Sequence, residues 1–107
     1  MDVNVLEKNI RLVYDTGKIS YGEKVCKRLI MAGKGKLIIL ANDCPKNIKN
    51  DVVYYSEMSQ IPIAIYPNSA LRLGETCGRP HPISIMIIEE EGDSKIIDVL
   101  TKKEEGN

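Results

Sequence analysis

Apolar residues recur every three or four positions in several stretches of the chain, which is the spacing of an amphipathic helix. In the first stretch these positions are Val3, Leu6, Ile10 and Val13. Asp2 is a suitable N-cap for this helix. Gly17 suits the left-handed residue that commonly follows a last helical turn. We therefore predict a helix that ends at Gly17.

The next two helices are predicted from glycine and proline residues at their ends. One begins at Gly22 or Glu23 and ends at Gly33, again by the preference for glycine after a helix. The other has Pro45 at its first position and runs to about Ser59. Their apolar sides hold Val25, Cys26, Leu29 and Ile30 in the earlier helix, and Ile48, Val52 and Tyr55 in the later one.

Short apolar runs predict the strands. LIILA at 37–41 is uninterrupted by polar residues, which is typical of a strand that is covered on both faces. Further strands are predicted at 18–21, 61–66 and 83–88, with Pro62 at a position that needs no ladder donor. Between the last two, Ser69 is predicted to cap a short helix, ALRLGETCG. Residues 95–100 fit either a strand or a helical turn, and residues 102–107 are expected to form a frayed tail.

Helices thus alternate with short apolar strands, which indicates the α/β class. The order predicts a three-layer α/β/α sandwich around a small mixed sheet of about four strands. A length of 107 residues predicts a single domain, 1–107. No apolar run approaches the roughly 20 residues that span a bilayer, and the N-terminal MDVNVLEKN is too polar for a secretory signal. We therefore expect a cytoplasmic protein without a membrane partner.

The distribution of charged residues along the chain adds to this picture. The net charge is zero, yet residues 1–50 hold ten Lys and Arg against five Asp and Glu, and residues 51–107 show the reverse. This asymmetry indicates a basic face beside an acidic remainder, and attraction of phosphate depends on the local patch. By charge alone, an uneven scatter of solvated side chains is the more common explanation.

The cysteines favour a reduced protein without metal or other cofactor. Cys26, Cys44 and Cys77 are an odd number and form no CxxC pair, so free thiols are a better interpretation than disulfides or zinc ligands. Cys77 and His81 lie four residues apart, but two ligands across a Gly-Arg-Pro turn make a poor metal site.

The chain offers little that could form an active site. GKGK at 33–36 lacks the spacing of a phosphate-binding P-loop, and no GxGxxG follows a strand. The acidic run Glu89 to Glu91 precedes a glycine turn and is typical of a solvated segment. One enzyme hypothesis remains, a thiol enzyme that uses Cys44 at a helix start, although no histidine or arginine lies nearby in sequence to activate it.

Polar residues instead gather in three loop clusters, around residues 17–24, 42–43 and 78–82. Loops at one end of an α/β sheet converge, and ligands bind at such ends. The clusters supply backbone amides, amide side chains and cations without an acid–base pair, which suits RNA phosphates and base edges. Glycines that end helices and prolines that stiffen loops explain the same residues without a ligand.

The helix that begins at Gly22 is the strongest of these signals. It carries Lys24, Lys27 and Arg28, and lysine in a first helical turn is locally unfavourable because the amide dipoles already make that end positive. Such a departure from local preference often marks a functional site. A glycine that lets another backbone approach, at a helix start, is also suited to an anion. We interpret this end as a receptor for a phosphate backbone.

Four motifs in order then resemble a known family: TGK-x3-G-x-K, LIILAN, YY-x4-IP and LG-x3-GRP. Together they make the chain similar, over about residues 3–100, to the archaeal and eukaryotic large-subunit ribosomal protein L-thirty-e family, part of the superfamily that binds kink-turn RNA. The resemblance implies an α/β/α sandwich without catalytic activity. It also implies binding to an internal loop in which tandem sheared G·A pairs bend the RNA sharply.

The resemblance also implies roles for particular residues. Gly22 would admit the RNA backbone, Lys24 would reach phosphate or guanine edges, and Asn42 would hydrogen-bond a base. The loop 79–83 would pack against the bent part of the RNA, with His81 where some relatives have a phenyl ring. The predicted RNA-binding residues are Gly17, Lys18, Gly22, Glu23, Lys24, Lys27, Arg28, Asn42, Arg79, His81 and Ile83.

The sequence therefore predicts a ribosomal RNA-binding subunit that is monomeric when free and has other ribosomal components, but no small-molecule substrate, as partners. The alternative within the superfamily is a kink-turn protein of a small ribonucleoprotein that guides RNA modification. The length and the LG-x3-GRP loop favour the ribosomal branch.

Overall fold

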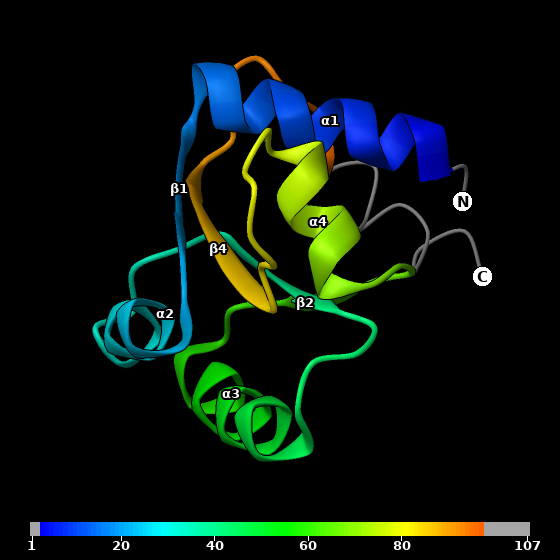
Figure 1. The fold of residues 1–107 in the computed structure, drawn as a ribbon. Coiled ribbons are helices and arrows are strands. Elements are labelled where there is room, and N and C mark those ends of the chain that lie inside the picture. The colour runs from blue at the N-terminus through cyan, green and yellow to red at the C-terminus, as the bar shows by residue number, and fades with distance from the viewer. Residues whose placement is uncertain (1–2, 98–107) are drawn as a thin grey trace, which may run out of the picture.

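The structure is a computed structural model that describes residues 3–97. Within these residues, four helices alternate with four strands, as predicted (Figure 1). The elements are α1 (Val3–Thr16), β1 (Lys18–Tyr21), α2 (Glu23–Met31), β2 (Leu37–Ala41), α3 (Lys46–Ser59), β3 (Ile63–Tyr66), α4 (Ala70–Thr76) and β4 (Ile85–Glu90). No helix within residues 3–97 is long and apolar enough to cross a membrane.

The strands form one mixed sheet in the order β1-β4-β2-β3. β4 pairs antiparallel with both β1 and β2, whereas β2 and β3 are parallel. Tyr21, Ala41 and Tyr66, the last residues of β1, β2 and β3, therefore lie at the same end of the sheet as the start of β4. We call this the carboxyl end. The opposite, amino end holds Lys18, where β1 begins, and Glu90, where β4 finishes.

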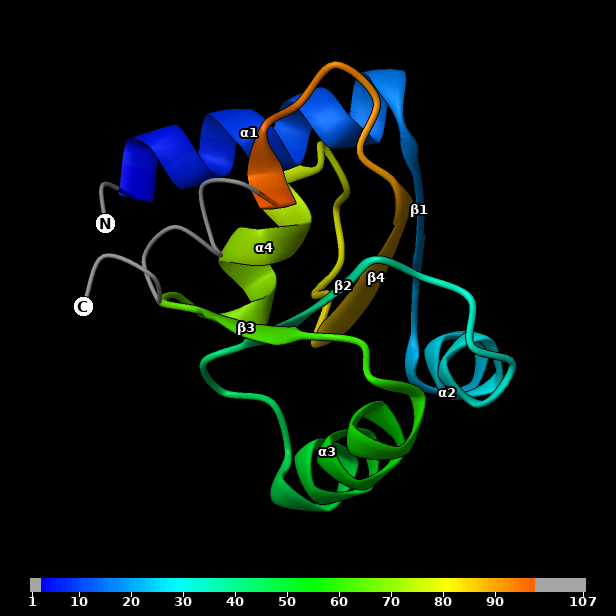
Figure 2. The same cartoon turned by 180° about the vertical axis from the view of Figure 1, so that it is seen from behind.

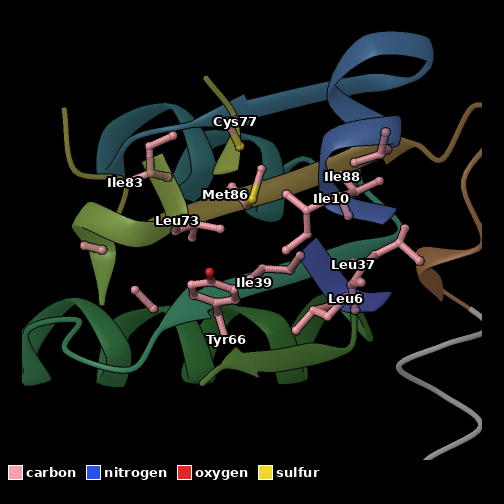
Figure 3. Packing of buried hydrophobic residues seen from close by; sticks show 14 residues of the cluster. Leu6, Ile10, Leu37, Ile39, Tyr66, Leu73, Cys77, Ile83, Met86 and Ile88 are labelled. Carbon is pink, nitrogen blue, oxygen red and sulfur yellow. The ribbon is translucent and has the colours of Figure 1, made fainter. Parts of the chain in front are cut away.

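Helices cover both faces of the sheet, which confirms the three-layer sandwich (Figures 1 and 2). β2 is buried throughout, and its alternate residues serve different cores. Leu37 and Ile39 pack with α1 and α4 in the larger core, which Figure 3 shows, whereas Ile38 and Leu40 pack with α2 and α3. Burial on two faces explains why this strand is apolar at every position.

The signals at helix ends locate most elements to within a residue or two. Gly33 has a φ of 71° and follows α2, with the hydrogen bonds of a Schellman motif: its own N–H donates to Ile30, and that of Lys34 donates to Leu29. Ser69 caps α4 by accepting a hydrogen bond from the N–H of Arg72. Both features were predicted from local sequence.

Several boundaries differ from the prediction. Pro45 is the N-cap of α3 and not its first helical residue. Strand β3 starts after Pro62, and β4 covers 85–90 instead of 83–88. Ile83 is buried like a strand residue, but its N–H donates to Ala70 of α4 and not to the sheet. An apolar run therefore predicted burial here more accurately than strand pairing.

The expectation that Gly17 adopts the left-handed conformation is wrong, because its φ is not positive. A side chain at this position would overlap the carbonyl oxygen of Glu90, so the glycine allows two backbone segments to pack closely. Gly92, with a φ of 60°, supplies the other side of the same contact. Of residues 95–100, Ile96 and Ile97 are helical, while 98–100, the tail 102–107 and the predicted cap Asp2 lie outside the described residues.

Candidate functional site

The junction between β1 and α2 leaves an open surface at the carboxyl end. Gly22 has a φ of 100° and a ψ of 147°, a conformation that residues with a side chain rarely adopt. Its N–H donates to Ile85, which fixes the junction to the start of β4. A Cβ built on Gly22 meets no atom within 4 Å, so this surface has room for another molecule's backbone.

The three predicted cations of α2 have different environments. Lys24 and Arg28 are exposed, one turn apart on the same face, and form no ion pair with another residue in 3–97. Lys27 instead lies 2.8 Å from both Glu23 and Asp51. These hydrogen bonds, chiefly the one donated to Asp51, raise the pKa of the Lys27 ammonium. Lys27 therefore links α2 to α3, and Glu23 is engaged with it.

The loop after β2 brings an amide side chain to the same end of the sheet. The N–H of Ala41 donates to Ser84, and the N–H of Asn42 donates to Asn68. Asp43 accepts a hydrogen bond of 2.8 Å from the N–H of Ala70, at the start of α4. These bonds hold the backbone while the Asn42 side chain stays exposed.

The loop between α4 and β4 packs tightly against α4. A side chain at Gly74 would overlap the carbonyl oxygen of His81, and the N–H of Arg79 donates to Gly74 at 2.8 Å. Ile83 is buried in the larger core, where Figure 3 shows it beside α4. The loop is thus anchored on both sides of the exposed residues Arg79 and His81.

Contacts with aromatic rings connect this loop to β1 and α1. The His81 ring lies 5.6 Å from the Tyr21 ring, centroid to centroid. The guanidinium carbon of Arg79 is 5.8 Å from the Tyr21 centroid and 5.3 Å from that of Tyr14. Arginine over an aromatic ring is held by the ring's negative face.

An open groove of about 340 Å³ runs between the β1–α2 junction and this loop. It is lined by Tyr21, Gly22, Glu23, Ile48, His81, Pro82, Ile83, Ser84 and Ile85. The predicted residues Gly22, Glu23, His81 and Ile83 therefore share one concave surface. Apolar walls beside polar groups are the usual composition of a binding groove.

Two predicted residues are not part of this arrangement. Gly17 and Lys18 lie at the amino end of the sheet, separated from Gly22 by the length of β1. Lys18 is 3.9 Å from Glu89, and Gly17 packs on Glu90. The prediction that all loop clusters converge is therefore wrong for this pair. The long-range pairing of β1 with β4, which separates them, has no local signal.

Comparison with known proteins agrees with the motifs of the chain. Residues 4–98 match the model of the "Ribosomal protein L7Ae/L30e/S12e/Gadd45 family". The chain belongs to this family. A match of this extent covers every described element except the first residue of α1.

Relatives within the family share most of their length with this chain. A protein of Methanocaldococcus jannaschii named "Large ribosomal subunit protein eL30" is 41% identical, over 99% of this chain and 94% of its own. One of the same name from Methanopyrus kandleri is 37% identical, over 94% of both chains. A solved protein of unknown function from Bacillus halodurans has a TM-score of 0.78 at 21% identity, covers 94% of this chain and 99% of its own, and shows the same fold.

Membership of this ribosomal-protein family supports the prediction that the chain is not an enzyme. The thiols agree with it. Burial, aided by the nearby charge of Asp43, raises the pKa of Cys44. Burial raises the pKa of Cys26 to about 12 and that of Cys77 to about 11. A thiol with a raised pKa is a poor nucleophile at neutral pH, so the hypothesis of a Cys44 enzyme loses its basis.

Two residues that contact Arg79, and one hydrogen bond of a third residue, have no signal in the local sequence. Tyr14 and Tyr21 contact Arg79 only because α1, β1 and the loop meet in the fold, and nothing local indicates that contact. Asp43 belongs to the predicted polar loop 42–43, but its hydrogen bond with the N–H of Ala70 joins segments 27 positions apart. The engagement of Lys27 by Glu23 could have been found, since an i, i+4 pair is visible in the sequence.

Proposed function

We propose that this protein is a component of the large ribosomal subunit that binds a kink-turn internal loop of ribosomal RNA through the carboxyl end of its sheet. The proposed contacts are Gly22, Glu23, Lys24, Arg28, Asn42, Arg79 and His81, while the buried Ile83 holds the 79–83 loop in place. The observation that carries it is the meeting of Gly22, Asn42 and the 79–83 loop at one end of the sheet. The names of its relatives favour the ribosomal assignment.

The geometry fits an opened RNA groove better than a regular helix. The major groove of A-form RNA is too deep and narrow for side chains to read. Sheared G·A pairs and a sharp bend expose base edges on a widened groove, which a helix start can enter. Gly22 then admits the backbone. Lys24 and Arg28, which form no ion pair within residues 3–97, meet phosphates directly.

The remaining predicted residues have lesser parts in this proposal. Lys27 acts indirectly, because its bonds to Glu23 and Asp51 fix the start of α2. Gly17 and Lys18 lie outside the contact surface. We further propose that residues 1–107 act as one RNA-binding domain, monomeric when free, within cytoplasmic ribosomes.

The test is a binding titration with two RNA hairpins. One contains a kink-turn internal loop, and in the other Watson–Crick pairs replace the sheared G·A pairs. We expect at least about tenfold tighter binding to the kink-turn hairpin, because a single lost base contact costs about 1–3 kcal/mol. Asn42→Ala should reduce this preference, whereas Asn47→Ala, on the exposed surface of α3, should leave it unchanged. Equal affinity of the wild type for both hairpins would contradict the proposal.

The class of RNA is tested separately by recovering the RNA that copurifies with the tagged protein from its own cells. Large-subunit ribosomal RNA is the expected result. Small guide RNAs without ribosomal RNA would instead support the modification-complex alternative.

A further inference from the structure

Two arginines gather around one tyrosine outside the groove. The guanidinium carbons of Arg11 and Arg79 lie 5.9 Å and 5.3 Å from the centroid of Tyr14. Arg11 comes from α1, whereas Arg79 comes from the loop before β4, so the fold brings together like charges that are 68 positions apart. Like charges repel, and an arrangement that concentrates them suits a ligand of opposite charge.

The local backbone makes room for this pair. Gly78 has a φ of 76°, and a Cβ built there would lie 2.5 Å from an Nη atom of Arg11. Arg11 therefore lies against Gly78, the residue that precedes Arg79. Both guanidinium charges also act on the buried Cys77 thiol, opposing the burial that raises its pKa, which agrees with their closeness.

Carboxylates of the described residues neutralise this cluster only in part. Arg11 Nε donates to Asp15 at 3.2 Å, but both side chains are about half exposed, and exposed i, i+4 pairs are weak. Arg79 forms no ion pair with any residue in the described range 3–97. Within residues 3–97, the Arg79 guanidinium thus has no carboxylate partner, and a stronger anion can displace Asp15 from Arg11.

The cluster is continuous with the groove. Arg79 contacts Tyr21 as well as Tyr14, and the Tyr21 ring lies beside that of His81, which lines the groove. A ligand that occupies the groove and continues past His81 would meet Arg79 and then Arg11. Guanidinium groups bind phosphate oxygens in a forked, two-bond geometry, which makes a phosphodiester backbone the fitting ligand.

We propose that Arg11 and Arg79 form a second phosphate-contact site, which extends the RNA interface from the groove onto the C-terminal half of α1. The inference rests on the proposed RNA-binding function. Tyr14 is a positioning residue here: its ring holds the two guanidinium groups together. Asp15 is a competitor that phosphate displaces.

The experiment measures the kink-turn hairpin's dissociation constant across salt concentrations for full-length variants. A lost phosphate contact lowers the slope of log K against log salt by about 0.7–0.9 in magnitude. We expect this change, with binding weakened on the order of tenfold at low salt, for Arg11→Gln and for Arg79→Gln. Lys49→Gln, which removes the same charge from the exposed surface of α3, should match the wild type.

Two further variants separate phosphate binding from a structural role. Asp15→Asn removes the competitor and should tighten binding, whereas a structural Arg11–Asp15 pair would make Asp15→Asn and Arg11→Gln equally harmful. Tyr14→Phe keeps the ring face and should bind like the wild type, while Tyr14→Leu should weaken binding. Thermal unfolding confirms that each variant is folded at the assay temperature.

The outcomes test this inference and the proposed RNA-binding function separately. A wild type that prefers the kink-turn hairpin, with Arg11→Gln retaining the full salt slope, would overturn the second site alone. The second site is likewise overturned if Asp15→Asn weakens binding as much as Arg11→Gln does. A wild type without preference for the kink-turn hairpin would overturn both the proposed function and this inference.

Discussion

The two ends of strand β1 each carry a glycine, and the two glycines do opposite things. At the amino end, Gly17 packs so closely on Glu90 that a side chain has no room. At the carboxyl end, Gly22 has free space around it and a backbone conformation that requires glycine. One glycine allows the protein to contact itself, and the other leaves the backbone open to another molecule.

The lysines at the two ends show the same difference. Lys18 and Lys36 at the amino end lie 3.9 Å from Glu89 and 2.7 Å from Glu91. Lys24 at the carboxyl end has no such partner in the described part of the chain. A glycine or lysine near a strand therefore does not by itself indicate a binding site. The fold must first show whether that residue packs on another part of the protein or forms an ion pair with it.

Replacing each of the two glycines by alanine should give the largest effect and should separate the two ends most clearly. Gly17→Ala should lower the free energy of unfolding by about 3 kcal/mol, because overpacking against a backbone carbonyl requires the backbone to move. Gly22→Ala should cost about 2 kcal/mol through backbone strain. Denaturant unfolding measures both.

The effects of the same two variants on RNA affinity should have the opposite order. Gly22→Ala should weaken kink-turn binding strongly, while the folded fraction of Gly17→Ala should bind with wild-type affinity. Weaker binding by folded Gly17→Ala than by Gly22→Ala would remove the distinction between the two ends.

A lysine pair gives the next largest effect. Lys24→Ala should weaken binding to the kink-turn hairpin and reduce its salt dependence, since one phosphate contact is lost. The free energy of unfolding should change by no more than about 0.5 kcal/mol, because the side chain is exposed and forms no ion pair with the residues that the structure describes. Lys18→Ala, with the same charge change, is the matched control and should bind like the wild type. A gel-shift titration in which Lys24→Ala equals the wild type would exclude Lys24 from the site.

The smallest effect concerns acid stability at the amino end. The hydrogen bond from Lys36 lowers the pKa of the Glu91 carboxyl below its ordinary value of 4.5. The Lys36–Glu91 pair therefore stabilises the fold at a pH above 4.5, the ordinary pKa of the carboxyl. This stabilisation is lost as the pH falls through the lowered pKa of Glu91. Glu91→Gln and Lys36→Gln should each flatten the decline of unfolding free energy in acid, without changing RNA affinity at neutral pH. A wild-type acid profile in both variants would show that this pair is not formed in solution.

The sequence predicts the fold well because its signals are local. Gly33 after α2, Ser69 before α4 and the apolar run of β2 each act within a few residues, and each indicated the element that the structure has. Gly17 shows the limit. A glycine after a helix has two explanations, and the one that holds depends on Glu90, 73 positions away.

The candidate site divides in the same way. Gly22 and Lys24 could be proposed from the sequence alone, because a glycine before a helix with a first-turn lysine is visible there. The contact of Arg79 with Tyr14 and Tyr21 could not, since it depends on how α1, β1 and a loop pack together. The ion pair of Lys27 with Asp51 could not be predicted either, because Asp51 belongs to another helix.

The most direct test of the difference between the two ends is amide chemical-shift mapping by NMR while kink-turn RNA is added. Binding through the carboxyl end predicts the largest shifts at residues 22–28, at Asn42 and at residues 79–83, with little change at 16–18 and 90–93. Shifts concentrated at the amino end, with Gly22 and Asn42 unaffected, would contradict binding through the carboxyl end.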